Sequence, residues 1–485
     1  MSDYSRVLLF AEKLTGKSGG ALEKKLNSQT TVVSLDPSIE GSLLTTRVLV
    51  ETLGRLPGKV VLCTENLSAG ETATIRKSFN KVRLQPLRTT DRIGGLKGAK
   101  VHIGTQYTKG VIRAVPEGYG AHITSSPSSI TIVRKANALG AVYTAALAAA
   151  EVFKIAASLT AERAPLFNDF TFCPVAFSSN LKLAPDLPED LEINAAILGL
   201  GAIGSAIALI LSELRLSGNL LLVDNERFDK PNLATYSLGG QEDTITKPWK
   251  IDLASKVLST YSVKPIKDPV QKLPALIDNG LLQWPAIVFS SLDTVDARHS
   301  AQRIWPDFLI DPATGDTFAG IRTVSSKQPC LMCFLSKYVG TKSSLEKLAQ
   351  ATGLGINTIW KGDNLLSKDD LNGLEDEQVE RLRPHIGKPV CGLADAFGLT
   401  GTKDNYQPAI PFVSQQAACL GVGRLLALKL GFAQNNNLIQ YDVFRGPHSA
   451  TILKQEAKPS CYCITNSEVI NTVRTSRIVQ SKQNT

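Results

Sequence analysis

Residues 195–224 read AAILGLGAIGSAIALILSELRLSGNLLLVD, and this stretch decides the fold. An apolar run of strand length, Ala195–Leu198, ends at a glycine-rich turn, and an apolar stretch of helical length, Ala202–Leu214, follows. A second apolar run, Leu220–Val223, ends at Asp224. Strand, turn, helix and strand in this order form a βαβ unit, which begins a doubly wound, mostly parallel α/β sheet of the Rossmann-like class.

The turn in this unit has the spacing G-x-G-x-x-G, through Gly199, Gly201 and Gly204. Because glycines lack side chains, phosphate oxygens can approach the backbone N–H groups at the start of the helix. Asp224 follows about 20 residues later, at the position where an acidic side chain accepts hydrogen bonds from ribose hydroxyls. A tight turn and a solvated aspartate would explain these residues equally well, so the pattern by itself indicates only nucleotide binding.

The sequence beyond Asp224 narrows the class of protein. Four further segments follow in order: DNERFDKPNL at 224–233, KPWK at 247–250, LDTVDAR at 292–298 and IDPATG at 310–315. Together with the glycine motif they resemble the ThiF/MoeB and ubiquitin-activating enzyme superfamily. The resemblance covers roughly residues 192–463, disfavours a nicotinamide dehydrogenase, and says nothing about the first 185 residues.

The resemblance implies that the chain adenylates the C-terminal carboxylate of a ubiquitin-like protein with MgATP and releases pyrophosphate. Lys250 would supply positive charge to the phosphates, Asp293 would hold Mg²⁺, and Asn232 would help to position phosphate beside the ribose-binding Asp224. This chemistry needs cations and N–H donors aimed at the phosphates, and Mg²⁺ is commonly held by one or two carboxylates plus phosphate oxygens. In isolation, Lys250 reads as a solvated helix residue and Asp293 as a helix N-cap.

One departure from the family pattern concerns the phosphate site. Family members usually carry Arg-Gln one residue after Asn-Leu, whereas this chain continues with Ala234, Thr235 and Tyr236. Arg227, a residue of the N-terminal unit or a residue of a second subunit could supply the missing charge. Otherwise the adenylation site is impaired.

Two close cysteine pairs lie about 130 residues apart, Cys330 with Cys333 and Cys461 with Cys463. Their spacings can chelate one tetrahedral Zn²⁺ through four thiolates, which would form a closed, structural site. Family members often carry two such pairs, although the second is more usually C-x-x-C than C-x-C. Buried cysteines without a metal are the alternative.

Cys391 stands alone between the two pairs, in a stretch that reads as a loop. The resemblance to activating enzymes of the two-step kind implies a thioester-forming cysteine in this region. A thiolate is a good nucleophile toward an acyl adenylate, and Lys388 and His385 could lower its pKa. A small core residue is the alternative.

The chain of 485 residues, 43% of them hydrophobic and 20% charged, is an ordinary globular sequence long enough for two folding units. We expect an N-terminal α/β domain over 1–163, a linker over 164–190, the adenylation domain over 191–464 and a tail over 465–485 that is flexible or used for contacts. The smaller N-terminal domain could be an inactive adenylation half or a partner-docking domain. Expected strands lie at 31–35, 59–63, 100–104, 286–290, 308–310 and 438–444, and expected long helices at 135–159 and 414–430.

Composition also bears on location and partners. The net charge of +9 is spread along the chain without a basic run or stripe, so we expect no nucleic-acid partner. The N-terminus lacks the features of a secretory signal. The apolar stretches 138–157 and 193–214 are interrupted by charges or glycines, so we expect buried elements of a cytoplasmic protein without membrane spans.

These patterns predict a ubiquitin-like-protein activating enzyme of prokaryotic style, using ATP, Mg²⁺ and Zn²⁺. Adenylation would occur at the Gly199 turn, a thioester would form on Cys391, and a conjugating enzyme would receive the product. Related proteins occur in bacterial ubiquitin-like conjugation and antiphage systems. The alternatives are a MoeB-like or ThiF-like sulfur-carrier adenylyltransferase without a thioester step, and a non-catalytic scaffold. Homodimers are common in the family, but a chain with two halves could mimic such a dimer internally.

Overall fold

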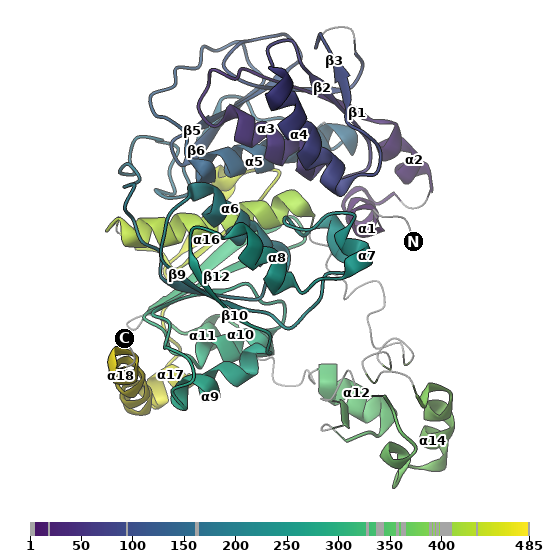
Figure 1. The fold of residues 1–485 in the computed structure, drawn as a ribbon, viewed down its shortest axis with the longest axis vertical. Coiled ribbons are helices and arrows are strands. Elements are labelled where there is room, and N and C mark those ends of the chain that lie inside the picture. Colours follow the sequence, from purple (N-terminus) through teal and green to yellow (C-terminus); the bar gives the residue numbers. More distant parts are fainter. Residues whose placement is uncertain are drawn as a thin grey trace. The chain divides into compact units, whose positions relative to one another are not determined.

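The computed structural model contains two mixed β-sheets and a small helical insertion (Figure 1). The structure describes residues 5–17, 20–93, 96–160, 164–325, 329–335, 344–355, 358–359, 365–387, 390, 393, 397, 410–432 and 435–483. Cys391, Lys388, Gly94 and Gly95 lie outside the described residues.

The N-terminal half builds a seven-stranded sheet in the order β3-β2-β1-β4-β5-β6-β7. The five strands β3, β2, β1, β4 and β5 run parallel to one another, and β6 and β7 continue the sheet in antiparallel pairs. The strands are β1 (Thr30–Leu35), β2 (Lys59–Cys63), β3 (Arg88–Thr90), β4 (Ala99–Ile103), β5 (Ile112–Glu117), β6 (Gly120–Thr124) and β7 (Phe170–Phe172). The helices are α1 (Ser5–Thr15), α2 (Gly20–Ser28), α3 (Ser42–Gly54), α4 (Ala69–Val82) and α5 (Ala138–Ala156).

The second half builds an eight-stranded sheet in the order β10-β9-β8-β11-β12-β13-β14-β15. Its strands are β8 (Ala195–Leu198), β9 (Asn219–Val223), β10 (Ser262–Ile266), β11 (Ile287–Ser290), β12 (Phe308–Gly315), β13 (Phe318–Ser325), β14 (Leu438–Asp442) and β15 (Thr451–Leu453). Its helices are α6 (Ala202–Leu214), α7 (Asp243–Thr246), α8 (Lys250–Val257), α9 (Leu273–Asp278), α10 (Val295–Gln302), α11 (Leu331–Phe334), α16 (Pro411–Lys429), α17 (Tyr462–Thr465) and α18 (Ser467–Gln483), with 3₁₀ turns η1 (Lys230–Ala234), η2 (Val270–Lys272) and η6 (Pro447–Ser449). The doubly wound, mostly parallel α/β class expected from the sequence is confirmed.

The first five strands have the same order and direction in both sheets. The parallel set β3-β2-β1-β4-β5 corresponds to β10-β9-β8-β11-β12, and each set continues into antiparallel strands. Helix α3 follows β1 as α6 follows β8, and each half contributes one long buried helix of 19 residues, α5 or α16. This correspondence supports the interpretation of the N-terminal half as a second copy of the fold.

The two halves share one hydrophobic core, formed where α3, α5, α6 and α16 pack together between the sheets (Figure 1). Phe153 of α5 lies 5.6 Å from Phe412 of α16 and 5.9 Å from Phe444, measured between ring centroids. Helix α5 is long and apolar enough to cross a membrane by composition, yet 94% of its apolar window is buried inside this protein. Its alanine-rich surface therefore serves close helix packing.

The region 164–190, which its prolines predicted to be a linker, contributes a strand to the first sheet. Strand β7 lies within it and pairs with β6 of the first sheet. The chain divides instead into one unit that contains both sheets, Met1–Leu335 with Pro408–Thr485, and a second unit, Ser336–Gln407. Sequence composition missed this arrangement because the apolar surface that joins the halves is carried by helices far apart in the chain.

The Ser336–Gln407 unit is inserted between α11 and α16 of the sequence. Its described elements are α12 (Ser344–Thr352), η3 (Asp369–Leu371), α14 (Asp376–Leu382) and η4 (Arg383–His385). A separate core holds them together: Leu348, Leu354, Ile359, Leu366, Leu371, Leu382, Val390 and Leu393.

The polar tail differs from the flexible segment expected from its composition, because Ser467–Gln483 forms helix α18. Arg477 donates hydrogen bonds of 2.7 and 3.0 Å to the carboxylate of Asp278, and Arg474 forms an ion pair with Asp307. Ile470 and Arg477, two turns apart, are the buried residues of one helix face. The tail is therefore used for contacts, and the expectation of flexibility is wrong.

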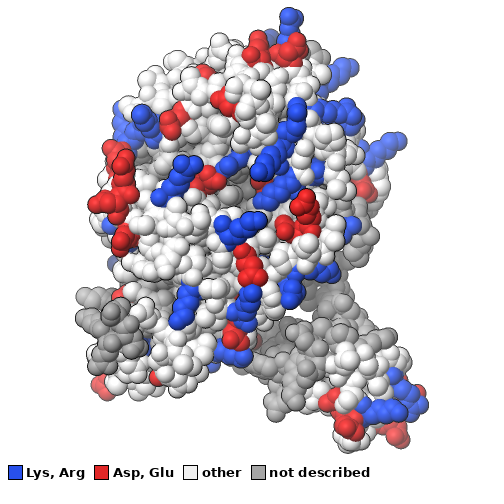
Figure 2. Space-filling model, in the orientation of Figure 1, with Lys and Arg blue, Asp and Glu red and all other residues white. Residues whose placement is uncertain are grey.

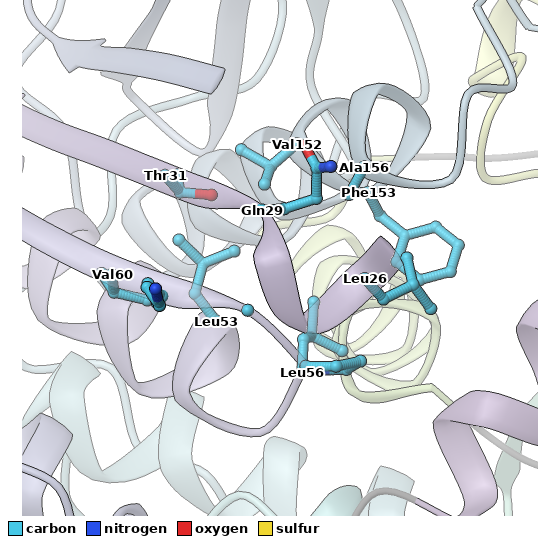
Figure 3. Close-up of a pocket in the computed structure, with 12 residues that line it drawn as sticks. Leu26, Gln29, Thr31, Leu53, Leu56, Val60, Val152, Phe153 and Ala156 are labelled. Atoms are coloured by element: carbon cyan, nitrogen blue, oxygen red, sulfur yellow. The ribbon is translucent and has the colours of Figure 1, made fainter. Parts of the chain in front are cut away.

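A small apolar cavity lies at the N-terminal ends of β1 and β2 (Figure 3). Its volume is about 20 Å³, and Leu26, Leu53, Val60 and Phe153 are among the side chains that line it. A space of this size has room for about one water molecule. The cavity is a gap in side-chain packing, and ligands of α/β sheets bind at the opposite, carboxyl ends of the strands.

Candidate functional site

The glycine turn after β8 lies against the loop that follows β11. Gly199 has a φ of +83°, and a Cβ there would lie 2.7 Å from the carbonyl oxygen of Ser291. A Cβ on Gly204 would lie 2.0 Å from the carbonyl oxygen of Gly199. The first and third glycines of the motif are therefore required by the close packing of strand, helix and neighbouring loop.

Gly201 differs from its two neighbours. Its φ of −71° suits any residue, and within the described chain an added Cβ would meet nothing within 4 Å. Gly201 is also the N-cap of α6, so no capping side chain occupies the N–H groups of the first turn. An anion can approach these N–H groups and the positive end of the helix dipole.

Asp224 is the first residue after β9, and its carboxylate fixes the glycine turn. One oxygen accepts a hydrogen bond of 2.6 Å from the N–H of Leu200, and the other accepts one of 2.7 Å from the N–H of Glu226. Burial raises the pKa of Asp224, whereas these two hydrogen bonds and the charge of Lys250 act in the opposite direction. Each carboxylate oxygen has a further lone pair that can accept a ligand hydroxyl.

Lys250 begins α8 and is only 4% exposed. Its ammonium forms an ion pair with Glu226, a partner that the sequence did not suggest although it lies within the DNERFDKPNL segment. The Lys250 backbone is held at both ends, because its N–H donates to the Glu226 carbonyl at 3.0 Å and its carbonyl accepts from the Tyr236 hydroxyl at 3.0 Å. The Glu226 side chain is 64% exposed, so the carboxylate rather than the ammonium can move when an anion binds.

Asn232 shapes the turn η1. Its side-chain oxygen accepts a hydrogen bond of 2.9 Å from the N–H of Asp229, and its carbonyl accepts from the N–H groups of Thr235 and Tyr236. Arg227, a candidate for the missing arginine, instead stacks over Trp249 at 4.4 Å from the ring centroid and donates to the Lys247 carbonyl. The Arg227 side chain thus binds the loop that precedes α8.

Asp293 is an exposed residue three positions after the end of β11. Its loop is braced by Arg298, which donates to the Leu292 carbonyl at 2.9 Å and to the buried Asp311 carboxylate at 2.8 and 3.0 Å. Arg322 donates to the same carboxylate at 2.7 Å. Sequence reasoning singled out the segments of Arg298 and Asp311 without assigning this bracing role, and it missed Arg322.

The parallel strands bring the predicted site residues to one edge of the second sheet. Gly199, Asp224 and Asp293 follow the carboxyl ends of β8, β9 and β11, which are neighbours in the sheet. This edge at the change of strand order is where doubly wound sheets bind their ligands. Acidic and basic side chains are interspersed over the face of the protein seen in Figure 2, in line with the charge spread expected from the sequence.

The four paired cysteines form one cluster. All four sulfur atoms lie within 4.8 Å of one another, and the Cys330–Cys333, Cys330–Cys461 and Cys333–Cys463 separations are 3.9, 3.5 and 3.6 Å. Zn–S bonds of about 2.3 Å in a tetrahedron place the sulfurs about 3.8 Å apart, so the donor set fits Zn²⁺. Cys330 and Cys461 each cap a short helix, α11 and α17, so the two pairs have similar local geometry. Burial raises the pKa of Cys333 to about 11, and a bound cation would oppose this shift.

Fold and site together define a doubly wound α/β protein with a candidate nucleotide site at the carboxyl edge of its second sheet. The model of the ThiF family matches residues 189–463, more than half of the sequence, and the chain belongs to this family.

The chain is also similar to individual proteins. It is 28% identical over 244 residues to the uncharacterized protein y4jF of Sinorhizobium fredii (strain NBRC 101917 / NGR234), a match that covers 49% of this chain and 43% of that protein. The chain thus spans less than half the length of this relative. Among solved structures, E. coli MccB with SeMet MccA is 13% identical, with a TM-score of 0.36, over 75% of this chain and 98% of that chain. The microcin C7 biosynthetic enzyme MccB in complex with N-formylated MccA is 13% identical, with a TM-score of 0.37, over 75% and 99%.

Proposed function

We propose that this chain is a cytoplasmic, ATP-dependent activating enzyme that adenylates the C-terminal carboxylate of a ubiquitin-like protein. It then carries the activated protein as a thioester on Cys391 and passes it to a conjugating enzyme of a bacterial conjugation or antiphage system. The observation that carries the proposal is the meeting of the Gly199 turn, Asp224 and Asp293 at one sheet edge, inside the region matched by the ThiF family.

In the first step, a carboxylate oxygen of the ubiquitin-like protein attacks the α-phosphorus of ATP. The bond from this phosphorus to the bridging oxygen breaks, and pyrophosphate leaves with the electron pair. The open N–H groups at the start of α6 and the ammonium of Lys250 offset the negative charge of the phosphates. Asp224 binds the ribose, Asn232 positions phosphate, and Asp293 would hold Mg²⁺, which supplies further positive charge to the leaving pyrophosphate.

In the second step, the thiolate of Cys391 attacks the acyl carbon, the bond to AMP breaks, and AMP leaves with the electron pair. The conjugating enzyme then receives the acyl group by exchange with its own thiol. Support comes from the position of Cys391 in the sequence, between the cysteine pairs and within the stretch of the separate Ser336–Gln407 unit. Val390 and Leu393, on either side of Cys391, are each 1% exposed and belong to the core of that unit.

The cysteine cluster would hold Zn²⁺ as a structural ion. Four thiolates close the coordination sphere, so the ion would tie α17 to α11 and take no part in the reaction. Since each chain already contains two copies of the fold in one core, we propose that the pairing of two subunits is mimicked internally, although two chains can still associate through other surfaces.

The experiment that tests the proposal is intact-protein mass spectrometry under non-reducing conditions. The full chain is mixed with MgATP and the ubiquitin-like protein encoded nearest to it. We expect an adduct that thiols release and that Cys391→Ala abolishes, whereas Cys63→Ala, which alters a buried cysteine of β2, should retain it.

Two other outcomes would replace the proposal. Pyrophosphate release without an adduct, lost in Asp293→Ala, would identify a sulfur-carrier adenylyltransferase of the MoeB or ThiF kind. Absence of both signals with every ubiquitin-like protein encoded in the source genome would identify a scaffold, a function that the Ala234-Thr235-Tyr236 departure favours.

A further inference from the structure

One loop of the second half is held by the first half. The loop, residues 233–241, begins with the last two residues of η1 and leads toward α7. Arg55, which directly follows α3, binds this loop at two points. The Arg55 guanidinium donates hydrogen bonds of 2.6 Å to the Leu233 carbonyl and 3.0 Å to the Gly239 carbonyl. Its other partner is Glu51, at 2.8 Å, and Arg55 is only 3% exposed.

The far end of the same loop is bound by α4 of the first half. The backbone N–H of Gln241 donates to the Lys81 carbonyl at 2.8 Å, and the Gln241 side chain donates to the Val82 carbonyl at 3.0 Å. Gly240 approaches so closely that a Cβ there would lie 2.5 Å from the Lys81 carbonyl oxygen. The first half therefore fixes this loop at Leu233, Gly239 and Gln241.

The loop in turn contacts two elements of the candidate site. Tyr236, 1% exposed, donates its hydroxyl hydrogen to the Lys250 carbonyl, and the N–H of Ser237 donates to Ser205 of α6 at 3.0 Å. At its start the loop continues directly from Asn232 in η1. Arg55 holds the loop at Leu233 and Gly239, and Tyr236 and Ser237 between these two points hold the Lys250 backbone and helix α6. The loop backbone thus connects Arg55 with both elements of the candidate site.

We propose that Arg55 is a positioning residue through which the N-terminal half sets the geometry of the adenylation site. It holds the 233–241 loop, and the loop holds Asn232 and Lys250 in place for the phosphates of MgATP. The inference rests on the proposed function and gives the N-terminal half a role in it without any chemistry of its own.

The chain offers a matched control for Arg55. Arg83 also donates to three backbone carbonyls, those of Gly54, Leu56 and Gly58, at 2.9, 2.5 and 2.8 Å. These acceptors are the last residue of α3 and two residues of the connection between α3 and β2, all in the first half. Loss of Arg83 removes carbonyl hydrogen bonds of the same kind whose acceptors all belong to the first half, and it keeps the Lys81 and Val82 carbonyls that accept from Gln241.

The experiment measures MgATP binding by isothermal titration calorimetry at a temperature well below the melting transition. For Arg55→Met we expect the Kd to rise by about tenfold or more, because a hydrogen bond from a charged group contributes at least about 1.4 kcal/mol, which is a factor of ten. Arg55→Lys keeps the charge and should restore part of the affinity. Arg83→Met should bind MgATP like the unaltered chain even where its melting temperature falls.

An unchanged Kd in Arg55→Met, or an equal loss in Arg83→Met, would overturn the inference. If Arg55→Met does not fold, Tyr236→Phe removes only the hydroxyl that donates to the Lys250 carbonyl. We then expect a higher Kd for MgATP at an unchanged melting temperature. An unchanged Kd in Tyr236→Phe would contradict the inference. Absence of MgATP binding in the unaltered chain would count against the proposed function itself, and the inference would fall with it.

Discussion

The two halves of this chain have the same order of parallel strands but different residues at the carboxyl edges. Asp224 follows β9, whereas Thr64 follows the corresponding β2; Asp293 stands three residues after β11, whereas Gln106 stands three residues after β4. The turn GLGAIG of the second half corresponds to DPSIEG at 36–41 in the first. Strand order is thus shared, while the residues suited to MgATP belong to the second half.

A half that lacks the nucleotide-binding residues can still be required by the fold. Helix α5 supplies Phe153 to the common core, and Arg55 reaches the loop beside the candidate site. Asp36 and Glu40 stand at the positions of Gly199 and Ile203, and their negative charges repel phosphate. The first half is therefore suited to packing and positioning.

The cysteine cluster belongs to the second half, and removal of its metal should have the largest effect. Chelation, or Cys330→Ser, should lower the melting temperature by about 10 °C, since a structural zinc contributes on the order of 10 kcal/mol. Each kcal/mol shifts Tm by about 1 °C in a chain of 485 residues, because the unfolding entropy grows with length. Calorimetry and elemental analysis check this. Cys63→Ala, in the first half, should leave the response to chelator unchanged; a chain without zinc and without that response would contradict the account.

Exchanging the residues that follow β9 and β2, Asp224 and Thr64, tests directly whether only the second half binds MgATP. Asp224→Thr should weaken MgATP binding on the order of a hundredfold, because hydrogen bonds that an ionised carboxylate accepts contribute about 1.5–3 kcal/mol each. Thr64→Asp should leave binding unchanged. Equilibrium titration of MgATP measures both, and equal losses in the two variants would show that both halves contribute to the site.

Two glycines of the turn are expected to have different roles, Gly204 in the packing of the turn and Gly201 in the binding of MgATP. Gly204→Ala should lower the melting temperature by several degrees, because its Cβ would overlap the Gly199 carbonyl. Gly201→Ala should melt normally and weaken MgATP binding by about tenfold, since its Cβ enters the open space beside α6. Normal MgATP binding by Gly201→Ala would argue against phosphate at this helix terminus.

The smallest effect is expected for an ion pair that links the halves. Arg47 of α3 pairs with Glu213 of α6, and their side chains are 28% and 24% exposed. Because partly exposed pairs contribute little, Arg47→Ala should change the free energy of unfolding by about 1 kcal/mol or less. Phe153→Ala in the shared core should cost about 3–5 kcal/mol. Chemical denaturation compares them, and a larger loss for Arg47 would show that charge rather than apolar packing joins the halves.

Local patterns predicted much of the fold. The strands expected at 31–35, 59–63 and 100–104 correspond to β1, β2 and β4, and the helix expected at 135–159 corresponds to α5. Their apolar runs have clear boundaries, so periodicity is informative. The antiparallel strands β13 and β15 were not predicted, because neither is a distinct apolar run and each depends on pairing with β14.

The site could be predicted where a residue type is tied to a motif. The glycine turn, Asp224 and Asp293 lie at the same sheet edge, and the two cysteine pairs lie together as their spacing suggested, while the roles of all these residues stay predictions. The Glu226 partner of Lys250 and the reach of Arg55 to Leu233 could not be foreseen, because they depend on how loops from distant parts of the chain meet. The helix α18 was missed because its buried face consists of few apolar residues and two arginines that find carboxylates elsewhere.

Pyrophosphate release tests most directly whether the chemistry belongs to the second half. The full chain, MgATP and the ubiquitin-like protein encoded nearest to it are assayed beside Asp293→Ala and Gln106→Ala, which alter corresponding positions of the two sheets. We expect that release is lost in Asp293→Ala and retained in Gln106→Ala. Release that persists in Asp293→Ala, or that disappears in Gln106→Ala, would contradict it.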